Sequence, residues 1–205
     1  FNNYQEGRKV LASLERELRY CDEFAISVAF ITMSGLVSLL PILAELEDRN
    51  IKGRILTTNY LNFSEPKALK RLQEFKNIEL KMFWSKNGSG FHTKGYMFRQ
   101  GDVYRLIVGS SNLTANALTK NEEWNTKVVS LAEGEYTLNI LSRFEQLWQA
   151  ENALTYDKFM TDYSNIYAAQ KAASIKLQQT SDVVITANKE NRLVADEAKY
   201  AGDVT

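Results

Sequence analysis

Hydrophobic residues occur at two spacings along the first 83 residues, and they predict a regular order of helices and strands. Recurrence every three or four positions, as at Val10, Leu14 and Leu18, predicts one buried helix face, whereas a nearly unbroken apolar run predicts a buried strand. By these patterns we expect helices at residues 4 to 20, 36 to 46 and 64 to 75, and strands at residues 24 to 30, 52 to 58 and 78 to 83. This alternation is typical of a mainly parallel sheet covered by helices.

The pattern changes after residue 90. Segments 92 to 98 and 103 to 108 lie on either side of a Gln-Gly-Asp turn, which predicts a β-hairpin. They are followed by a turn at residues 109 to 111, a short helix at 113 to 118, a strand at 124 to 131 and a helix at 138 to 148. The expected fold class is therefore α/β, with a mixed, mostly parallel sheet that carries helices on both faces, and with a C-terminal helical tail.

The chain divides near residue 152, where the core-forming periodicity ends. A chain of 205 residues can form one well-buried domain and an appendage. We expect a domain at residues 1 to 152 and a helical, then polar, connector at residues 153 to 205. Such a connector would lead to a further domain that this chain does not contain.

Composition narrows the class of protein. Lys plus Arg and Asp plus Glu both number 25, so overall charge does not favour nucleic acid, although a local basic patch still can bind it. Cys21 is the only cysteine, which excludes an internal disulfide and favours a reducing, cytoplasmic location. The longest apolar stretch, residues 24 to 33, is too short to span a bilayer, and we expect no membrane partner. With one histidine and one cysteine, we expect neither a zinc site nor any other cofactor.

The sharpest chemical feature is His92-Thr93-Lys94. Side chains on a strand alternate between its faces, so His92 and Lys94 should point the same way. An imidazole beside an ammonium group suits an anionic ligand. Alone, the pair is more typical of a half-exposed strand end with two polar residues.

Two polar segments follow the hairpin. Gly109-Ser110-Ser111-Asn112 stands at a strand-to-helix turn and could direct N–H groups and hydroxyls at a phosphate, although it also fits an ordinary helix cap. The second segment contains Glu122 and Glu123, one of which could orient a histidine ring. By itself, that segment also fits a solvated charged turn.

In combination, FHTKGYMF followed by IVGSSNLTANALTKNEEWN resembles the HKD motif of the phospholipase D superfamily, in its nuclease branch. That motif is H-x-K-x(4)-D followed by G-S-x-N and, in nucleases, N-x-E. The likeness extends over residues 5 to 150 to the phospholipase-D-like domain at the N-terminus of bacterial DEAD/DEAH-box helicases and to related restriction endonucleases. Arg99 replaces the aspartate of the motif.

The resemblance implies a mechanism without a metal ion. His92 would attack phosphorus and form a phosphohistidine that water then cleaves. Lys94 and Asn112 would hold the non-bridging oxygens, with Ser110 and Ser111 beside them. Glu123 would orient the His92 ring and stabilise its charged form.

The resemblance also implies a homodimer, because a complete site of this family uses two histidines and the chain has one. The expected substrate is nucleic acid, with DNA favoured over RNA, since the sequence has no basic amphipathic helix for a lipid surface. Further groove residues would be Tyr60, Asn62, Lys86, Asn87 and Lys120. The alternative is a non-catalytic module that holds DNA for a helicase motor, which the change to Arg99 favours.

Overall fold

A seven-stranded sheet forms the centre of the first compact unit, Phe1–Ser164. The computed structural model describes residue 3 and residues 9–85 and 91–177. The strands are β1 (Glu23–Val28), β2 (Lys52–Thr58), β3 (Ile78–Phe83), β4 (Lys94–Gln100), β5 (Val103–Gly109), β6 (Asn125–Leu131) and β7 (Ala153–Thr155). The helices are α1 (Val10–Tyr20), α2 (Met33–Val37), α3 (Leu40–Asp48), the short η1 (Tyr60–Asn62), α4 (Pro66–Gln73), α5 (Ala115–Thr119) and α6 (Glu135–Trp148). A further helix spans residues 156–177.

The sheet has the order β6-β5-β4-β1-β2-β3-β7 and is mixed. Parallel pairing joins β1 to β2 and β2 to β3, while the remaining described pairs are antiparallel. The α/β class and the mixed sheet are confirmed, but the expectation that most pairs would be parallel is wrong. Only Gly101 and Asp102 separate β4 from β5, and so short a connection can only join antiparallel neighbours.

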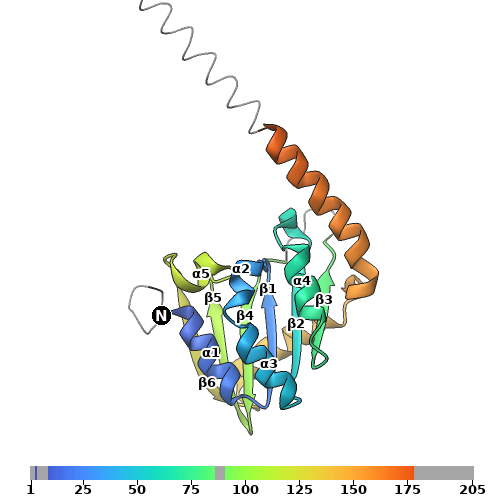
Figure 1. Ribbon diagram of the computed structural model, residues 1–205. Helices are drawn as coiled ribbons and strands as arrows, with labels where there is room; N and C mark the ends of the chain where they lie inside the picture. Colours follow the sequence, from blue (N-terminus) through green and yellow to red (C-terminus); the bar gives the residue numbers. More distant parts are fainter. Residues whose placement is uncertain (1–2, 4–8, 86–90, 178–205) are drawn as a thin grey trace, which may run out of the picture. The chain divides into compact units, whose positions relative to one another are not determined.

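Helices cover both faces, as expected. On one face, α6 packs Phe144 and Trp148 against Met97 and Leu106 of the sheet. On the other face, side chains from alternate strand positions pack against α1, α3 and α4. They are Phe24, Ile26, Val28, Tyr96, Phe98 and Ile107. Figure 1 shows α1 to α5 on this near side of the sheet. Alternation along the strands thus builds two separate layers of core.

One local difference from the expected elements has a clear cause. The helix expected at residues 36 to 46 is two helices, because Pro41 stands in the first turn of α3 and cannot continue a preceding helix. Gly35 in α2 is needed for close packing, since a Cβ there would lie 2.3 Å from the Leu113 carbonyl oxygen. This contact presses α2 against the segment that follows the glycine-serine turn.

The first unit extends beyond the boundary expected at residue 152. Strand β7 pairs with β3, and Phe159 and Tyr163 of the last helix are fully buried in the core. The Tyr163 hydroxyl donates a hydrogen bond to the Ser64 carbonyl oxygen at 2.7 Å. The second unit is Asn165–Thr205, of which residues 165–177 are described as helix. Its role as a connector stays a prediction. No helix among the described residues is long and apolar enough to cross a bilayer.

Candidate active site

His92 and Lys94 lie side by side at the beginning of β4. The strand begins at Lys94, so His92 stands just before it rather than within it. The Lys94 Nζ atom is 2.7 Å from His92 Nδ1 and donates a hydrogen bond to the His92 carbonyl oxygen at 3.1 Å. Between them, Thr93 Oγ1 lies 2.6 Å from Ser27 Oγ of β1, which anchors the segment to the sheet. His92 is exposed and Lys94 is half-buried.

Electrostatics at this pair favour a neutral imidazole and lower the pKa of both side chains. Burial, and then the positive charge of Lys94, lower the pKa of His92 below its ordinary value of 6.5. Burial also lowers the pKa of Lys94, while the negative charge of Glu123 opposes this and raises it. An uncharged ring nitrogen near neutral pH is what a nucleophilic histidine needs.

The glycine-serine turn is fixed to the segment that carries Glu123. A Cβ on Gly109 would lie 2.2 Å from the Trp124 carbonyl oxygen, so only glycine lets β5 end this close to β6. The Ser110 hydroxyl donates to the Glu123 carboxylate and accepts from the Trp124 N–H at 3.0 Å. Glu123 is only 7% exposed, whereas Glu122 is exposed. The two polar segments of the sequence therefore form one hydrogen-bonded unit.

Ser111 lies under this unit and has a structural place. Its side chain is fully buried, and its hydroxyl oxygen accepts a hydrogen bond from the Asn125 side chain at 3.0 Å. Its carbonyl oxygen accepts from the Tyr96 hydroxyl at 2.9 Å. The hydroxyl of Ser111 consequently braces the turn from below and is shielded from a ligand.

Asn112 is held from the other side by the loop after β1. Its Oδ1 atom accepts a hydrogen bond from the Phe30 N–H at 3.1 Å, and Leu113 N–H donates to the Phe30 carbonyl oxygen at 3.1 Å. Within the described part of the chain, the Asn112 amide nitrogen makes no hydrogen bond and can donate to a ligand oxygen. The Phe30 ring also contacts the His92 ring, with centroids 5.7 Å apart. Phe30 thus joins Asn112 to the histidine.

The remaining predicted residues differ in whether the structure places them at His92. The Tyr60 ring lies against the His92 ring, with centroids 5.7 Å apart, and Asn62 is in the same short helix. Lys120 is exposed at the end of α5. Lys86 and Asn87 lie outside the described residues. Among the described residues, the hydrogen bond that Glu123 accepts comes from Ser110, and none joins Glu123 to His92.

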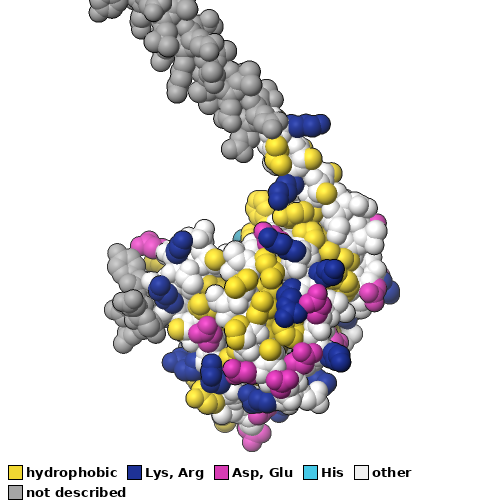
Figure 2. Space-filling model, viewed as in Figure 1, with side chains coloured by type: hydrophobic (Ala, Val, Ile, Leu, Met, Phe, Trp, Pro, Cys, Tyr) yellow, Lys and Arg dark blue, Asp and Glu magenta, His cyan; other side chains and the backbone are white. Residues whose placement is uncertain are grey.

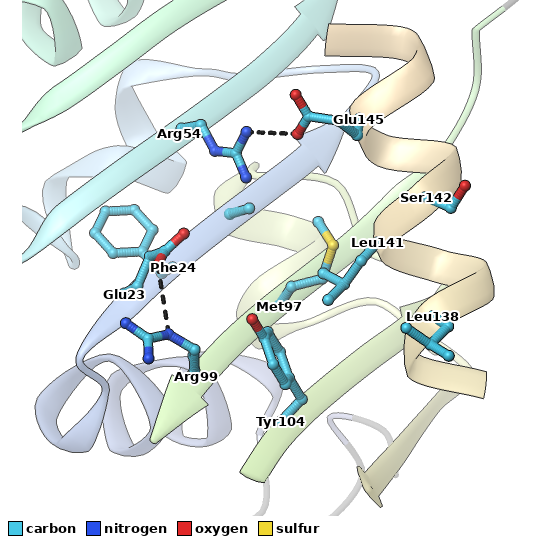
Figure 3. Close-up of a pocket in the computed structure, with 11 residues that line it drawn as sticks. Glu23, Phe24, Arg54, Met97, Arg99, Tyr104, Leu138, Leu141, Ser142 and Glu145 are labelled. Atoms are coloured by element: carbon cyan, nitrogen blue, oxygen red, sulfur yellow. Dashed lines mark hydrogen bonds and ion pairs between the residues drawn. The ribbon is translucent and has the colours of Figure 1, made fainter. Parts of the chain in front are cut away.

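Arg99, which stands where the motif has aspartate, lies at the far end of β4 from Lys94. Five residues along a strand span about 16 Å. The Arg99 guanidinium pairs with Glu23 at 3.4 Å and lines a cavity of about 360 Å³ between the sheet and α6, together with Arg54, which pairs with Glu145. Figure 3 shows both ion pairs in this cavity. The change to arginine therefore leaves the His92–Lys94 pair untouched.

A separate cavity of about 260 Å³ adjoins the candidate site. It is lined by His92, Lys94 and Gly109, and on the α6 side by Arg143 and Phe144. An apolar cavity with a few convergent polar groups is typical of a ligand site. The sequence did not indicate Phe30 or this α6 wall, because neither belongs to a polar motif.

Comparison with known proteins gives matches to a family model and to solved structures. The family model described as cardiolipin synthase, PLD-like domain, matches residues 21–148. No curated protein sequence matches the chain. The fold is similar to NucT from Helicobacter pylori, with a TM-score of 0.54 and 16% identity over 71% of this chain and 90% of that one. It is also similar to Nuc, a phospholipase D family member from Salmonella typhimurium, with a TM-score of 0.52 and 19% identity over 70% of this chain and 88% of that one.

Phosphatidylserine synthase from Haemophilus influenzae shares the fold at a TM-score of 0.51 and 13% identity, over 80% of this chain and 43% of that one. These identities show a common fold. The family match goes further, because it spans more than half of the chain and includes His92, Lys94, Asn112 and Glu123. The resemblance to the phospholipase D superfamily is thereby confirmed: the chain belongs to the family of phospholipase-D-like domains.

Proposed function

We propose that the chain is a metal-independent phosphodiesterase that cleaves nucleic acid, with DNA favoured, through a phosphohistidine. One observation carries the proposal: an imidazole with a lowered pKa lies 2.7 Å from an ammonium group, and Phe30 contacts both this imidazole and the Asn112 side chain. Family membership supports phosphodiester chemistry in general. The similarity of the fold to NucT and Nuc supports nucleic acid as the substrate.

In the proposed reaction, a His92 ring nitrogen attacks phosphorus. A P–N bond forms while the P–O bond to the leaving oxygen breaks, and a proton moves to that oxygen. Water then attacks phosphorus and returns a proton to the group that protonated the leaving oxygen, the P–N bond breaks, and His92 is restored. Lys94 and the Asn112 amide stabilise the charge that develops on the non-bridging oxygens, a task that metal ions perform in other enzymes.

Glu123 supports Lys94 in this proposal. Its carboxylate is almost completely buried and raises the pKa of Lys94, so it keeps the ammonium group charged in a half-buried position. It also fixes the Ser110 hydroxyl, and through it the turn that carries Asn112. A direct contact between Glu123 and an imidazole, as the family resemblance implies, stays a prediction.

We further propose that two copies of the chain share the site. The leaving oxygen needs a proton donor, and the sequence offers one histidine. A two-fold axis beside the exposed His92 would bring a second imidazole to the opposite side of the phosphate.

The alternative is a module that binds DNA without cleaving it and holds it for a helicase motor attached downstream. It uses the same phosphate site. Arg99 lies at the far end of β4 and pairs with Glu23, so its presence in place of aspartate supports this alternative less than the sequence pattern indicates.

An assay in EDTA separates the two functions. Labelled single- and double-stranded DNA and RNA are incubated with the wild-type chain and with His92→Ala. Strand breaks in EDTA that disappear in His92→Ala would support the phosphodiesterase. Binding without breaks in either protein would establish the binding module, and breaks that persist in His92→Ala would refute the assignment of the nucleophile.

A further inference from the structure

An exposed aromatic ring, Phe63, lies one ring away from the candidate nucleophile. Phe63 is 52% exposed, and its ring centroid is 5.1 Å from that of Phe30. Phe30 in turn lies edge-on to His92 at 5.7 Å, and Tyr60 contacts the same imidazole at 5.7 Å. The four rings form a continuous aromatic surface, which we call the aromatic platform: Tyr60, His92, Phe30 and Phe63.

The platform extends over the beginning of α4. Leu61, between Tyr60 and Phe63 in the sequence, is 49% exposed. Figure 2 shows hydrophobic side chains gathered on the surface over η1 and the beginning of α4. Large apolar side chains exposed together, beside a polar site, mark a surface that binds something.

The turn that carries Phe63 is held in place at several points. Ser85 N–H donates to Asn59 Oδ1 at 2.7 Å, and Tyr60 N–H donates to Thr58 Oγ1 at 3.1 Å. After the turn, Ser64 is fully buried and its hydroxyl accepts from Ile31 N–H at 3.1 Å. These anchors fix the position of the exposed ring and lower the ordering cost of binding a ligand there.

The turn also contains strained backbone. Leu61 and Asn62 have φ angles of 54° and 48°, in the left-handed region that glycine prefers. Two consecutive non-glycine residues in this region persist only because the surrounding bonds hold them, and such strain gathers at ligand sites.

The chemistry of the neighbouring groups indicates the ligand. A phosphate held by Lys94 and Asn112 would place the adjoining nucleoside beside the aromatic platform. Every nucleobase has a π-face that stacks on an exposed aromatic ring. In a duplex those faces are already covered by neighbouring bases, whereas in a single strand they are accessible.

We propose that Phe63, supported by Phe30, stacks on an unpaired nucleobase next to the scissile phosphate, so that the preferred substrate is single-stranded nucleic acid. This inference rests on the proposed phosphodiesterase function and specifies its substrate. The stacking is independent of sequence, because any base can provide the π-face.

The test compares two single strands with equal length and equal numbers of phosphates, one of which lacks bases over its central stretch. Binding is measured with the full chain carrying His92→Asn, so that no strand is cut. The base-bearing strand should bind about 5- to 150-fold more tightly than the abasic strand. Adding Phe63→Ala should remove most of this preference, Phe63→Trp should keep it, and Phe63→Leu, which is apolar but not planar, should not restore it.

Tyr20→Ala is the matched control. Tyr20 is an aromatic residue that is 61% exposed, and it ends α1 at the opposite end of β1 from the site. Its removal should leave the preference for bases unchanged. A base preference that is the same with and without Phe63 would overturn the inference. Equal affinity for single strand and duplex would also overturn it.

Two further measurements keep the inference apart from the proposed function. Hydrolysis of bis(4-nitrophenyl) phosphate by the wild-type chain, lost in His92→Asn, reports phosphodiesterase chemistry without a nucleobase. If this hydrolysis occurs and the base preference does not, only the inference fails. If Phe63→Ala weakens binding to phosphatidylglycerol vesicles but not to strands, the platform serves a lipid and the inference is refuted.

Discussion

Glu123→Gln is the substitution that tests the candidate site most directly. It removes one negative charge while keeping the size of a side chain that is only 7% exposed. The carboxylate accepts a hydrogen bond from Ser110 and raises the pKa of Lys94. Its loss therefore weakens the brace under Asn112 and the charge balance of Lys94 together.

The expected loss follows from the single charged hydrogen bond. Hydrogen bonds to charged groups contribute about 1.5–3 kcal/mol, which corresponds to a loss of about 10- to 150-fold in kcat/KM. Affinity for a strand should change little, because Glu123 carries the same sign of charge as the phosphate and is not expected to contact it. The assay is turnover of a labelled strand beside equilibrium binding of the same strand.

The pH profile distinguishes an electrostatic role from a merely structural one. Lys94 acts as a cation, so turnover falls as pH rises through its pKa. Without the Glu123 charge that pKa is lower, and the alkaline decline should begin at a lower pH in Glu123→Gln. Glu122→Gln is the matched control, because Glu122 is the exposed neighbour. If Glu122→Gln slows turnover and Glu123→Gln does not, the role given to Glu123 is wrong.

Three more predictions concern the same site. Lys94→Ala should weaken binding, abolish turnover and flatten the slope of log affinity against log salt by up to about one. His92→Asn should abolish turnover alone. Equal loss of binding in both variants would contradict this division of roles. Because His92 is the only histidine, its NMR titration is unambiguous, and its pKa should lie below 6.5 and rise in Lys94→Ala; an unchanged pKa would deny the contact. Tyr96→Phe leaves the buried Ser111 carbonyl oxygen without its hydrogen-bond donor and should lower the free energy of unfolding, measured in urea, by about 1–3 kcal/mol. A free energy of unfolding equal to that of the wild type would contradict the importance of this hydrogen bond.

Sequence patterns predicted the parts of this fold that depend on local spacing. Apart from the helix that Pro41 divides, the helices and strands up to Phe83 follow from apolar periodicity. The contact between His92 and Lys94 follows from their separation by one residue. The direction of strand pairing did not follow, because it depends on where β4 enters the sheet. The pairing of β4 with β1 joins segments far apart in the sequence, so local patterns do not predict it.

The candidate site was predictable only where it coincides with a motif. Gly109 pairs with Asn125 in the β5–β6 register, and this long-range pairing brings Ser110 beside Glu123. Phe30 ends an apolar run and Phe63 lies in a turn, so each looked like ordinary core or loop in the sequence. Their role appears only when the loops after β1 and β2 meet over His92.

The bond between Tyr163 and Ser64 sets the smallest fragment that can be expected to work. Ser64 is shared: its carbonyl oxygen accepts from Tyr163, and its hydroxyl accepts from the N–H of Ile31, the neighbour of Phe30. A protein cut after residue 152 would lose this donor together with the buried ring of Phe159. The loss of these side chains would leave a cavity in the core next to the loop after β1, whose Phe30 contacts His92. A shortened form of this chain should therefore keep the helix at least to Ser164, although Glu123, the last residue of the motif, lies 41 residues before it (164 − 123).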